Sequence, residues 1–324
     1  MPVGARAREG LLLGLDVGTT RIKAVVLDAG GVERAGASVA TPFLASTDGV
    51  DMEVADLGRA LAAVVAALGP TREDVVAVGL AGMAESGAPL RAGRPVGPVI
   101  AWHDGRGEET VASLERRFGP ALARWTGRRI RTVSSLAKLG WLLDHGLPEP
   151  DRWLGVPELA LFLLTGAEAT EHSLAARTGA YHVTERRFLP EVIAHVLAGA
   201  HPRIRAGAET GTGSDPSARV GAVVEREVGA GPGAGAERGP GLFPSVRPAG
   251  VAMGFVTGDA ATRYGLPAGI PVTIAGHDHL AAAAGLGAGP DDLLNSVGTA
   301  ETLVRRLDTA PDVERALKLD LAVT

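Results

Sequence analysis

The hydrophobic pattern begins with two short apolar runs, LLLGL at 11–15 and IKAVVL at 22–27. The polar turn DVGTT separates them, and Gly30-Gly31 supplies a second turn. Apolar runs separated by Gly turns are typical of consecutive antiparallel strands. The pattern therefore predicts a β-meander at the start of the chain rather than a βαβ unit.

The following segments alternate between helical and strand patterns. Residues 55–68 have the apolar spacing of a helix, and 75–80 (VVAVGL) have the pattern of a buried strand. Another strand is predicted at 270–275, followed by Gly-His-Asp-His and a helix of small residues. Two strand-like runs surround Gly298 within 293–306. Alternation of this kind predicts an α/β fold.

The middle of the chain is predicted to be helical. Ser134 or Ser135 can cap a helix through LAKLGWLLDH, and a second apolar helix is expected at 157–164. Residues 206–241 are rich in Gly, Ala, Ser and Pro and have little periodicity. This composition favours a mobile loop or insertion.

Composition restricts the class of protein. The 324 residues are enough for two domains, and no apolar run approaches the ~18 residues of a membrane span. The N-terminus lacks the apolar stretch of a signal peptide, so we expect a cytoplasmic protein. The absence of cysteine excludes thiol catalysis, disulfides and cysteine-based zinc sites. A net charge of −5 and 4% aromatic residues argue against nucleic-acid binding.

The first candidate for chemistry is the turn DVGTT. A strand delivers Asp16 to its end, Gly18 permits close backbone approach, and Thr19 and Thr20 offer hydroxyl and N–H groups. These groups suit phosphate oxygens, with Asp16 placed to hold Mg²⁺ or its waters. The alternative is an ordinary hairpin turn, since the same residue types are common in turns. The chain contains neither a P-loop nor a Rossmann fingerprint.

The second candidate is Asp278, between a predicted strand and a predicted helix. A carboxylate there can lie beside a helix N-terminus, close to phosphates bound at that end. His277 and His279 flank it, and residues two apart in a strand share a face, so a metal site is an alternative. No further ligand set follows at metal-binding spacing, which favours a substrate-contact or packing role for the histidines.

Two weaker candidates remain. The segment from Trp102 through Asp104 to Arg106 offers an apolar face and both charge signs to a polyol, or a surface ion pair beside a core tryptophan. Gly298-Thr299 repeats the Gly-Thr turn and could contact a phosphate.

Taken together and in order, these segments resemble the FGGY carbohydrate kinases, within the actin–hexokinase–Hsp70 superfamily. The similar stretches include LGLDVGTTRIKAVVLD, GLAGMAESG, PVGPVIAWHDGRGEE, SLAKLGWLLDH, LFLLTG, TEHSLAARTGAYHV and GLPAGIPVTIAGHDHLAAAAGLGAG. The resemblance runs from residue 11 to residue 306, broken only by 206–241.

The resemblance implies a ribonuclease-H-like α/β domain at 10–288 that binds the sugar, and the start of a second, nucleotide-binding domain at 289–324. It implies ATP-dependent phosphorylation of a sugar or polyol, with ATP and Mg²⁺ required. The implied roles are as follows: Asp278 as catalytic base, Asp16 at Mg²⁺ and the transferring phosphate, Gly18, Thr19, Thr20, Gly298 and Thr299 at nucleotide phosphates, and Met83, Glu85, Trp102, Asp104 and His279 at the substrate.

Several departures leave alternatives open. Met83 and Ala84 stand where relatives often carry Gln and Met or Arg, so the resemblance does not identify the sugar. Ala300 replaces a serine that relatives have after Gly-Thr. Family members are generally much longer, so we expect most of the second domain to be missing, which makes a non-catalytic sugar-binding or regulatory protein an alternative. An ATPase closer to Hsp70 or actin is a third hypothesis, and the sequence leaves open whether the chain forms a homodimer.

Overall fold

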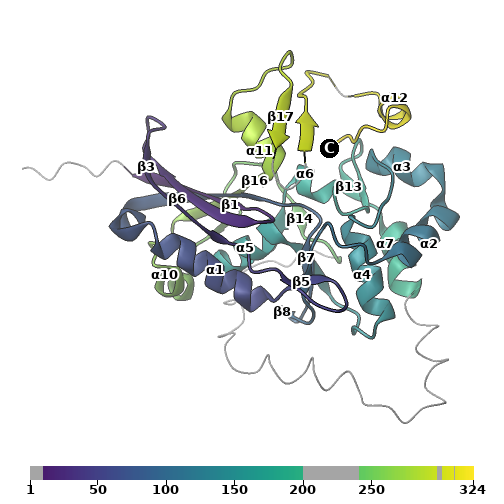
Figure 1. Ribbon diagram of the computed structural model, residues 1–324, viewed down its shortest axis with the longest axis horizontal. Coiled ribbons are helices and arrows are strands. Elements are labelled where there is room, and N and C mark those ends of the chain that lie inside the picture. Colours follow the sequence, from purple (N-terminus) through teal and green to yellow (C-terminus); the bar gives the residue numbers. More distant parts are fainter. Residues whose placement is uncertain (1–9, 200–240, 298–300, 310) are drawn as a thin grey trace, which may run out of the picture.

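The computed structural model describes residues 10–199, 241–297, 301–309 and 311–324 (Figure 1). Its largest sheet is mixed and has the order β15-β16-β6-β1-β2-β3. The strands are β1 (Leu11–Val17), β2 (Arg21–Leu27), β3 (Glu33–Ala40), β6 (Val75–Gly82), β15 (Gly254–Phe255) and β16 (Pro271–His277). β1, β2 and β3 form the predicted antiparallel meander, whereas β6 pairs in parallel with both β1 and β16. The predicted α/β fold with antiparallel opening strands is confirmed.

Hydrophobic alternation places the core of this sheet. Leu13, Leu15 and Val17 of β1 are at most 2% exposed, whereas Leu12, just before them, is 46% exposed. Successive side chains of a strand point to opposite faces, so one face of β1 is buried. The covering helices are α1 (Val54–Ala66) and α5 (Val156–Thr165), which pack on the sheet and on each other, and α10 (Gly258–Tyr264), which packs on both of these helices.

A second sheet has the order β10-β7-β9-β5-β4, with β8 beside β7. Its strands are short: β4 (Leu44–Ala45), β5 (Val50–Met52), β7 (Gly87–Arg91), β8 (Arg94–Pro95), β9 (Val99–Ile100) and β10 (Arg152–Gly155). β7 begins two residues after Glu85, and β9 ends two residues before Trp102. This sheet therefore anchors both loops that the sequence assigns to the substrate.

Helices form a separate layer around a second apolar cluster that includes Leu114, Leu139 and Val192. They are α2 (Glu108–Phe118), α3 (Pro120–Thr126), α4 (Ser135–Asp144) and α7 (Pro190–Gly199), grouped beside the second sheet in Figure 1. α4 begins after Ser134, which confirms the predicted helix start. The remaining short elements are η1 (Gly69–Asp74), α6 (His172–Ala175), β11 (Ala169–Thr170), β12 (Tyr181–His182), β13 (Arg187–Phe188) and β14 (Ser245–Val246).

The C-terminal part begins with α11 (Asp278–Gly285), against which β18 (Glu301–Val304) packs. β18 pairs with β17 (Leu294–Val297) in a two-stranded sheet, as the sequence predicted, and α12 (Val313–Lys318) packs on α3. The domain division at residue 289 stays a prediction. Apart from residue 241, the predicted loop 206–241 lies outside the described residues. Among the helices of the described segments, none has both the length and the hydropathy of a membrane span.

Candidate active site

Two carboxylates lie at the same edge of the large sheet. In the strand register, Val17 of β1 and His277 of β16 both pair with Gly82 of β6. Neighbouring strands are ~4.8 Å apart, so β1 and β16 are separated by ~10 Å on either side of β6. Asp16 comes just before this row and Asp278 just after it. The negative charge of Asp278 contributes to raising the pKa of Asp16, which agrees with this proximity.

Asp16 has one engaged and one free carboxylate oxygen. Its Oδ2 lies 3.6 Å from Lys23 Nζ, while Oδ1 is buried and accepts no hydrogen bond within the described part of the chain. Burial is the main cause that raises the Asp16 pKa, and Lys23 opposes it. A buried carboxylate oxygen without a donor is costly unless a ligand compensates it, and such an oxygen is a preferred ligand of Mg²⁺. The residues present therefore fit the expected metal role.

The DVGTT turn is held from two sides. Thr41 Oγ1 donates to Gly18 O at 2.7 Å, and Trp102 Nε1 donates to Thr19 Oγ1 at 2.8 Å. A Cβ at Gly18 would lie 3.0 Å from Arg21 O, which favours glycine here. Thr20 is exposed at the tip of the turn. The turn is therefore held in place by hydrogen bonds, and the phosphate contacts expected of these residues stay a prediction.

A β-bulge directs Asp278 into the site. The pairing of β16 with β6 shifts register between Ile274 and Gly276, and Gly276 has φ +126°. A Cβ at Gly276 would lie 2.8 Å from both Glu171 Oε2 and Ser173 Oγ, so only glycine fits. Ser173 Oγ accepts a hydrogen bond from His277 N at 2.9 Å. Bulges next to active sites commonly reorient a side chain, and this one ends the strand so that Asp278 begins α11, as predicted.

Ionisable groups surround Asp278. Its Oδ1 accepts from His279 N at 2.7 Å and lies 3.2 Å from His277 Nε2. Burial raises the Asp278 pKa and Glu85 adds to this, whereas His279 and Arg177 oppose it. Burial, followed by the charges of Arg177 and other neighbours, lowers the pKa of His277 to about 3, so this imidazole stays neutral. A carboxylate with a raised pKa is better suited to accept a proton than an ordinary one.

Glu85 is held by two arginines that the sequence analysis missed. Its Oε1 lies 2.8 Å from Arg128 Nη1 and 2.9 Å from Arg177 Nη2. The Glu85 backbone has φ +70°, an uncommon conformation for a non-glycine residue that is typical of functional loops. Met83, two residues earlier, is 2% exposed and packs in the main core. The Met83 side chain thus serves packing, and its expected substrate contact stays a prediction.

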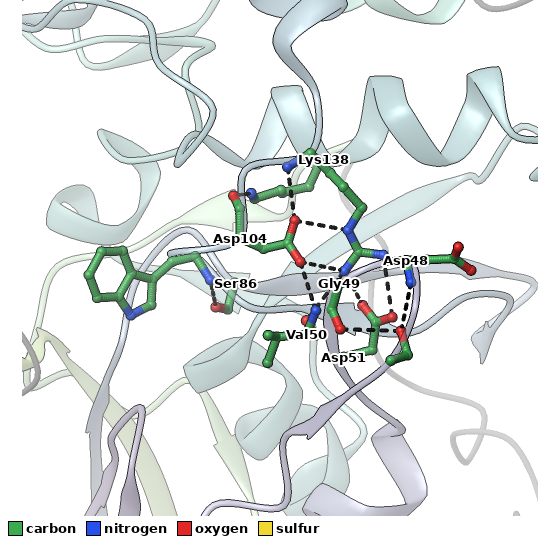
Figure 2. Close-up of polar contacts among 10 residues, drawn as sticks. Asp48, Gly49, Val50, Asp51, Ser86, Asp104 and Lys138 are labelled. Carbon is green, nitrogen blue, oxygen red and sulfur yellow. Dashed lines mark hydrogen bonds and ion pairs between the residues drawn. The ribbon is translucent and has the colours of Figure 1, made fainter.

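Asp104 organises the Trp102 loop through its carboxylate (Figure 2). Its Oδ1 accepts from Arg106 N and Nε at 2.8 and 2.9 Å, and its Oδ2 accepts from Val50 N at 2.7 Å. These bonds outweigh the opposing effect of burial and lower the Asp104 pKa. Arg106 also contacts Asp51, and Lys138 Nζ donates to the Asp104 backbone oxygen. The ion pair of the alternative interpretation exists, but it is buried and not on the surface.

The remaining predicted residues are His279, which lies in the site, and two residues outside the described ranges. His279 lies beside Asp278, with its Nδ1 2.8 Å from Ser296 Oγ. His277, Asp278 and His279 form a group whose ligand atoms all lie within 4.8 Å of one another. Gly298 and Thr299 lie outside the described residues.

Comparison with known protein families identifies one match. The N-terminal domain of the FGGY family of carbohydrate kinases matches residues 11–208, more than half of the chain. The chain belongs to the FGGY family. The family match includes the meander, the Glu85 loop and the Trp102 loop.

Similar curated proteins are kinases of the same family. L-fuculokinase of Salmonella typhi is 26% identical over 313 residues, covering 92% of this chain and 57% of that protein. Glycerol kinase of Gloeobacter violaceus is 31% identical over 219 residues, covering 63% of this chain and 44% of that protein. This FGGY chain thus spans about half the length of the curated relatives it matches.

Solved structures agree on the fold. Xylulose kinase from Rhodospirillum rubrum has a TM-score of 0.71 at 24% identity, covering 90% of this chain and 55% of that one. Ligand-bound xylulose kinase from Lactobacillus acidophilus also has a TM-score of 0.71, at 18% identity, covering 91% of this chain and 54% of that one. The predicted fold class of the FGGY chain is confirmed by this likeness.

Proposed function

We propose that this FGGY protein phosphorylates a hydroxyl group of a sugar or polyol with ATP as the phosphate donor. One observation carries the proposal: Asp16 and Asp278 stand at the same sheet edge, and burial raises the pKa of both. Phosphoryl transfer depends mainly on alignment and charge neutralisation, for which two such carboxylates beside a Gly-Thr turn are suited. A sugar or polyol substrate, ATP and Mg²⁺ are assigned to this chain as part of the proposal.

In the proposed mechanism, Asp278 orients the attacking hydroxyl and takes its proton late in the transition state, since an alcohol is a weak acid. Asp16 would hold Mg²⁺ through Oδ1, which has no hydrogen-bond partner among the described residues. Bound Mg²⁺ supplies neutralisation of charge on the transferring phosphate. Gly18, Thr19 and Thr20 would contact the phosphate oxygens through N–H and hydroxyl groups.

The sugar pocket would be formed by the two loops that the second sheet anchors. Arg128 and Arg177 fix the Glu85 carboxylate, and the Asp104–Arg106 pair fixes the backbone next to Trp102. Groups held in this way bind a substrate with little loss of conformational entropy. His279 would contact the substrate beside the base. Cytoplasmic location and homodimer formation stay predictions.

The test is sugar-dependent ADP release by the protein, measured across pentoses, hexoses and polyols. Asp278→Asn removes the base and should lower turnover by ~10²–10⁴-fold. Asp259→Asn is the matched control, since Asp259 is an exposed aspartate in the first turn of α10 and should leave turnover unchanged. Full turnover in Asp278→Asn would remove this residue from the mechanism. Sugar binding in calorimetry without any turnover would favour the non-catalytic alternative.

A further inference from the structure

Three side chains converge where β16 meets α11. His277 Nε2 lies 3.2 Å from Asp278 Oδ1, and His279 Nε2 lies 3.7 Å from the same oxygen. The two imidazole rings meet edge to face, with centroids 5.0 Å apart. Strand alternation does not produce this arrangement, because the strand ends at His277 and Asp278 already belongs to the helix. The strand-to-helix turn brings the three ligand atoms together.

Two of the three separations are close to those of a transition-metal centre, and all three lie within 4.8 Å. A tetrahedral ion with ligand distances of ~2.0–2.1 Å holds its ligand atoms ~3.4 Å apart. The two separations from Asp278 Oδ1 lie on either side of this value. We propose that His277, Asp278 and His279 form a binding site for one first-row transition-metal ion such as Zn²⁺, with the fourth position open.

The donor set distinguishes this site from the Mg²⁺ role of Asp16. Two imidazole nitrogens and one carboxylate oxygen suit zinc, cobalt or ferrous ions, whereas Mg²⁺ takes oxygen ligands almost exclusively. Three protein ligands and one open position are typical of accessible rather than structural zinc sites. The side chains of His277, Asp278 and His279 are 12%, 27% and 22% exposed, so solvent reaches the group.

A supporting contact orients His279 for this purpose. Its Nδ1 lies 2.8 Å from Ser296 Oγ in β17, which leaves the Nε2 lone pair for a ligand when Nδ1 carries the proton. Metal-binding histidines usually have such an outer partner on the second ring nitrogen. Thr302 Oγ1 is 3.4 Å from Nε2, a weak contact that an ion would replace.

Nearby cationic side chains are paired with carboxylates other than Asp278. Arg128 and Arg177 are paired with Glu85, and Lys23 is paired with Asp16.

Metal binding and phosphoryl transfer would then exclude each other. An ion bound to Asp278 lowers the basicity of the carboxylate that must accept the hydroxyl proton, so we expect Zn²⁺ to inhibit turnover. This consequence rests on the proposed function, whereas the binding site itself does not.

The test is a Co²⁺ titration of the chain followed by visible absorption, with Zn²⁺ added afterwards to displace Co²⁺. We expect one Co²⁺ per chain with the absorption of a four-coordinate centre. Ser296→Ala should weaken binding by ~10- to 100-fold, the usual cost of losing an outer partner, and His279→Ala or His277→Ala should weaken it further. His145→Ala is the control, because this exposed histidine stacks on Trp141 at the end of α4 and should not change binding.

Three outcomes would overturn the proposed site. They are no Co²⁺ absorption in the wild type, a loss of Co²⁺ affinity in His145→Ala equal to that in His279→Ala, or displacement of Co²⁺ by millimolar Mg²⁺. Each variant is first checked by circular dichroism. If His277→Ala does not fold, His279→Ala and Ser296→Ala still decide the question, since both side chains are partly exposed. Because Co²⁺ absorption does not depend on turnover, the metal site can be confirmed even if the kinase proposal is wrong. Equally, the kinase proposal can be confirmed even if no metal binds here.

Discussion

Glu158, in the first turn of α5, is a fully enclosed carboxylate beneath the Glu85 loop. Its Oε1 accepts a hydrogen bond from Thr170 Oγ1, while Oε2 is buried without a partner in the described part of the chain. Burial raises the pKa of Glu158 to about 7, with the charge of Glu171 adding to this and the Thr170 hydrogen bond opposing it. The folded protein therefore keeps a proton on Glu158 that the unfolded chain releases at lower pH.

The difference between about 7 and the ordinary value of 4.5 determines the size of the effect. At 1.36 kcal/mol per pH unit, it corresponds to about 3 kcal/mol. Because the folded-state pKa is the higher one, this free energy is lost as pH rises from 4.5 through 7, and it is not lost below 4.5.

The substitution Glu158→Gln removes the charge and retains an acceptor oxygen for Thr170. The variant should be more stable than the wild type by about 1 kcal/mol at pH 5 and by about 3 kcal/mol at pH 8. The measurement is urea unfolding followed by tryptophan fluorescence from pH 5 to 8.5. Glu149→Gln removes a charge from an exposed position and serves as the control. A Glu158→Gln stability profile parallel to that of the wild type would refute the reasoning.

Three further substitutions probe the site. Gly276→Ala places a Cβ 2.8 Å from Glu171 and Ser173 at φ +126°, so the unfolding free energy should fall by ~1–3 kcal/mol. Because the change should also displace Asp278, steady-state kinetics should show a fall in kcat with a smaller change in KM. Arg106→Lys keeps the charge but loses the planar fork on Asp104, and urea unfolding should show a loss of ~2 kcal/mol. Trp102→Phe deletes the hydrogen bond to Thr19, which should lower the unfolding free energy by ~1 kcal/mol. Steady-state kinetics should show a higher KM for ATP, because Thr19 belongs to the proposed phosphate turn, as well as for the sugar.

Each of these substitutions has a matched control. Gly285→Ala, at the end of α11, meets no atom within 4 Å and should not lower stability. Arg34→Lys, at a 54% exposed ion pair, should cost less than ~1 kcal/mol. Trp125 contacts the Phe118 ring and not the DVGTT turn, so Trp125→Phe should leave the KM for ATP unchanged. Equal effects in a variant and its control would contradict the corresponding explanation.

Much of the site could be predicted because its residues stand at the ends of regular elements. Asp16 follows an apolar run and Asp278 separates a strand pattern from a helix pattern, so local periodicity alone locates both. The Glu85 contacts could not be found this way. Arg128 and Arg177 come from distant segments of ordinary composition, and no local signal distinguishes them from surface arginines.

The sequence by itself determined the meander, the principal helices and the family, since these depend on short-range periodicity and on motifs in a constant order. Only the tertiary structure decided how the motifs act. It showed that the Asp104 carboxylate accepts hydrogen bonds from Arg106 and Val50, and that the turn from β16 to α11 places two histidines beside the carboxylate of Asp278. The physical reason is that burial and contacts between distant segments determine the protonation state of a side chain and which of its atoms remain available to a ligand. The order of residues along the chain specifies neither property directly.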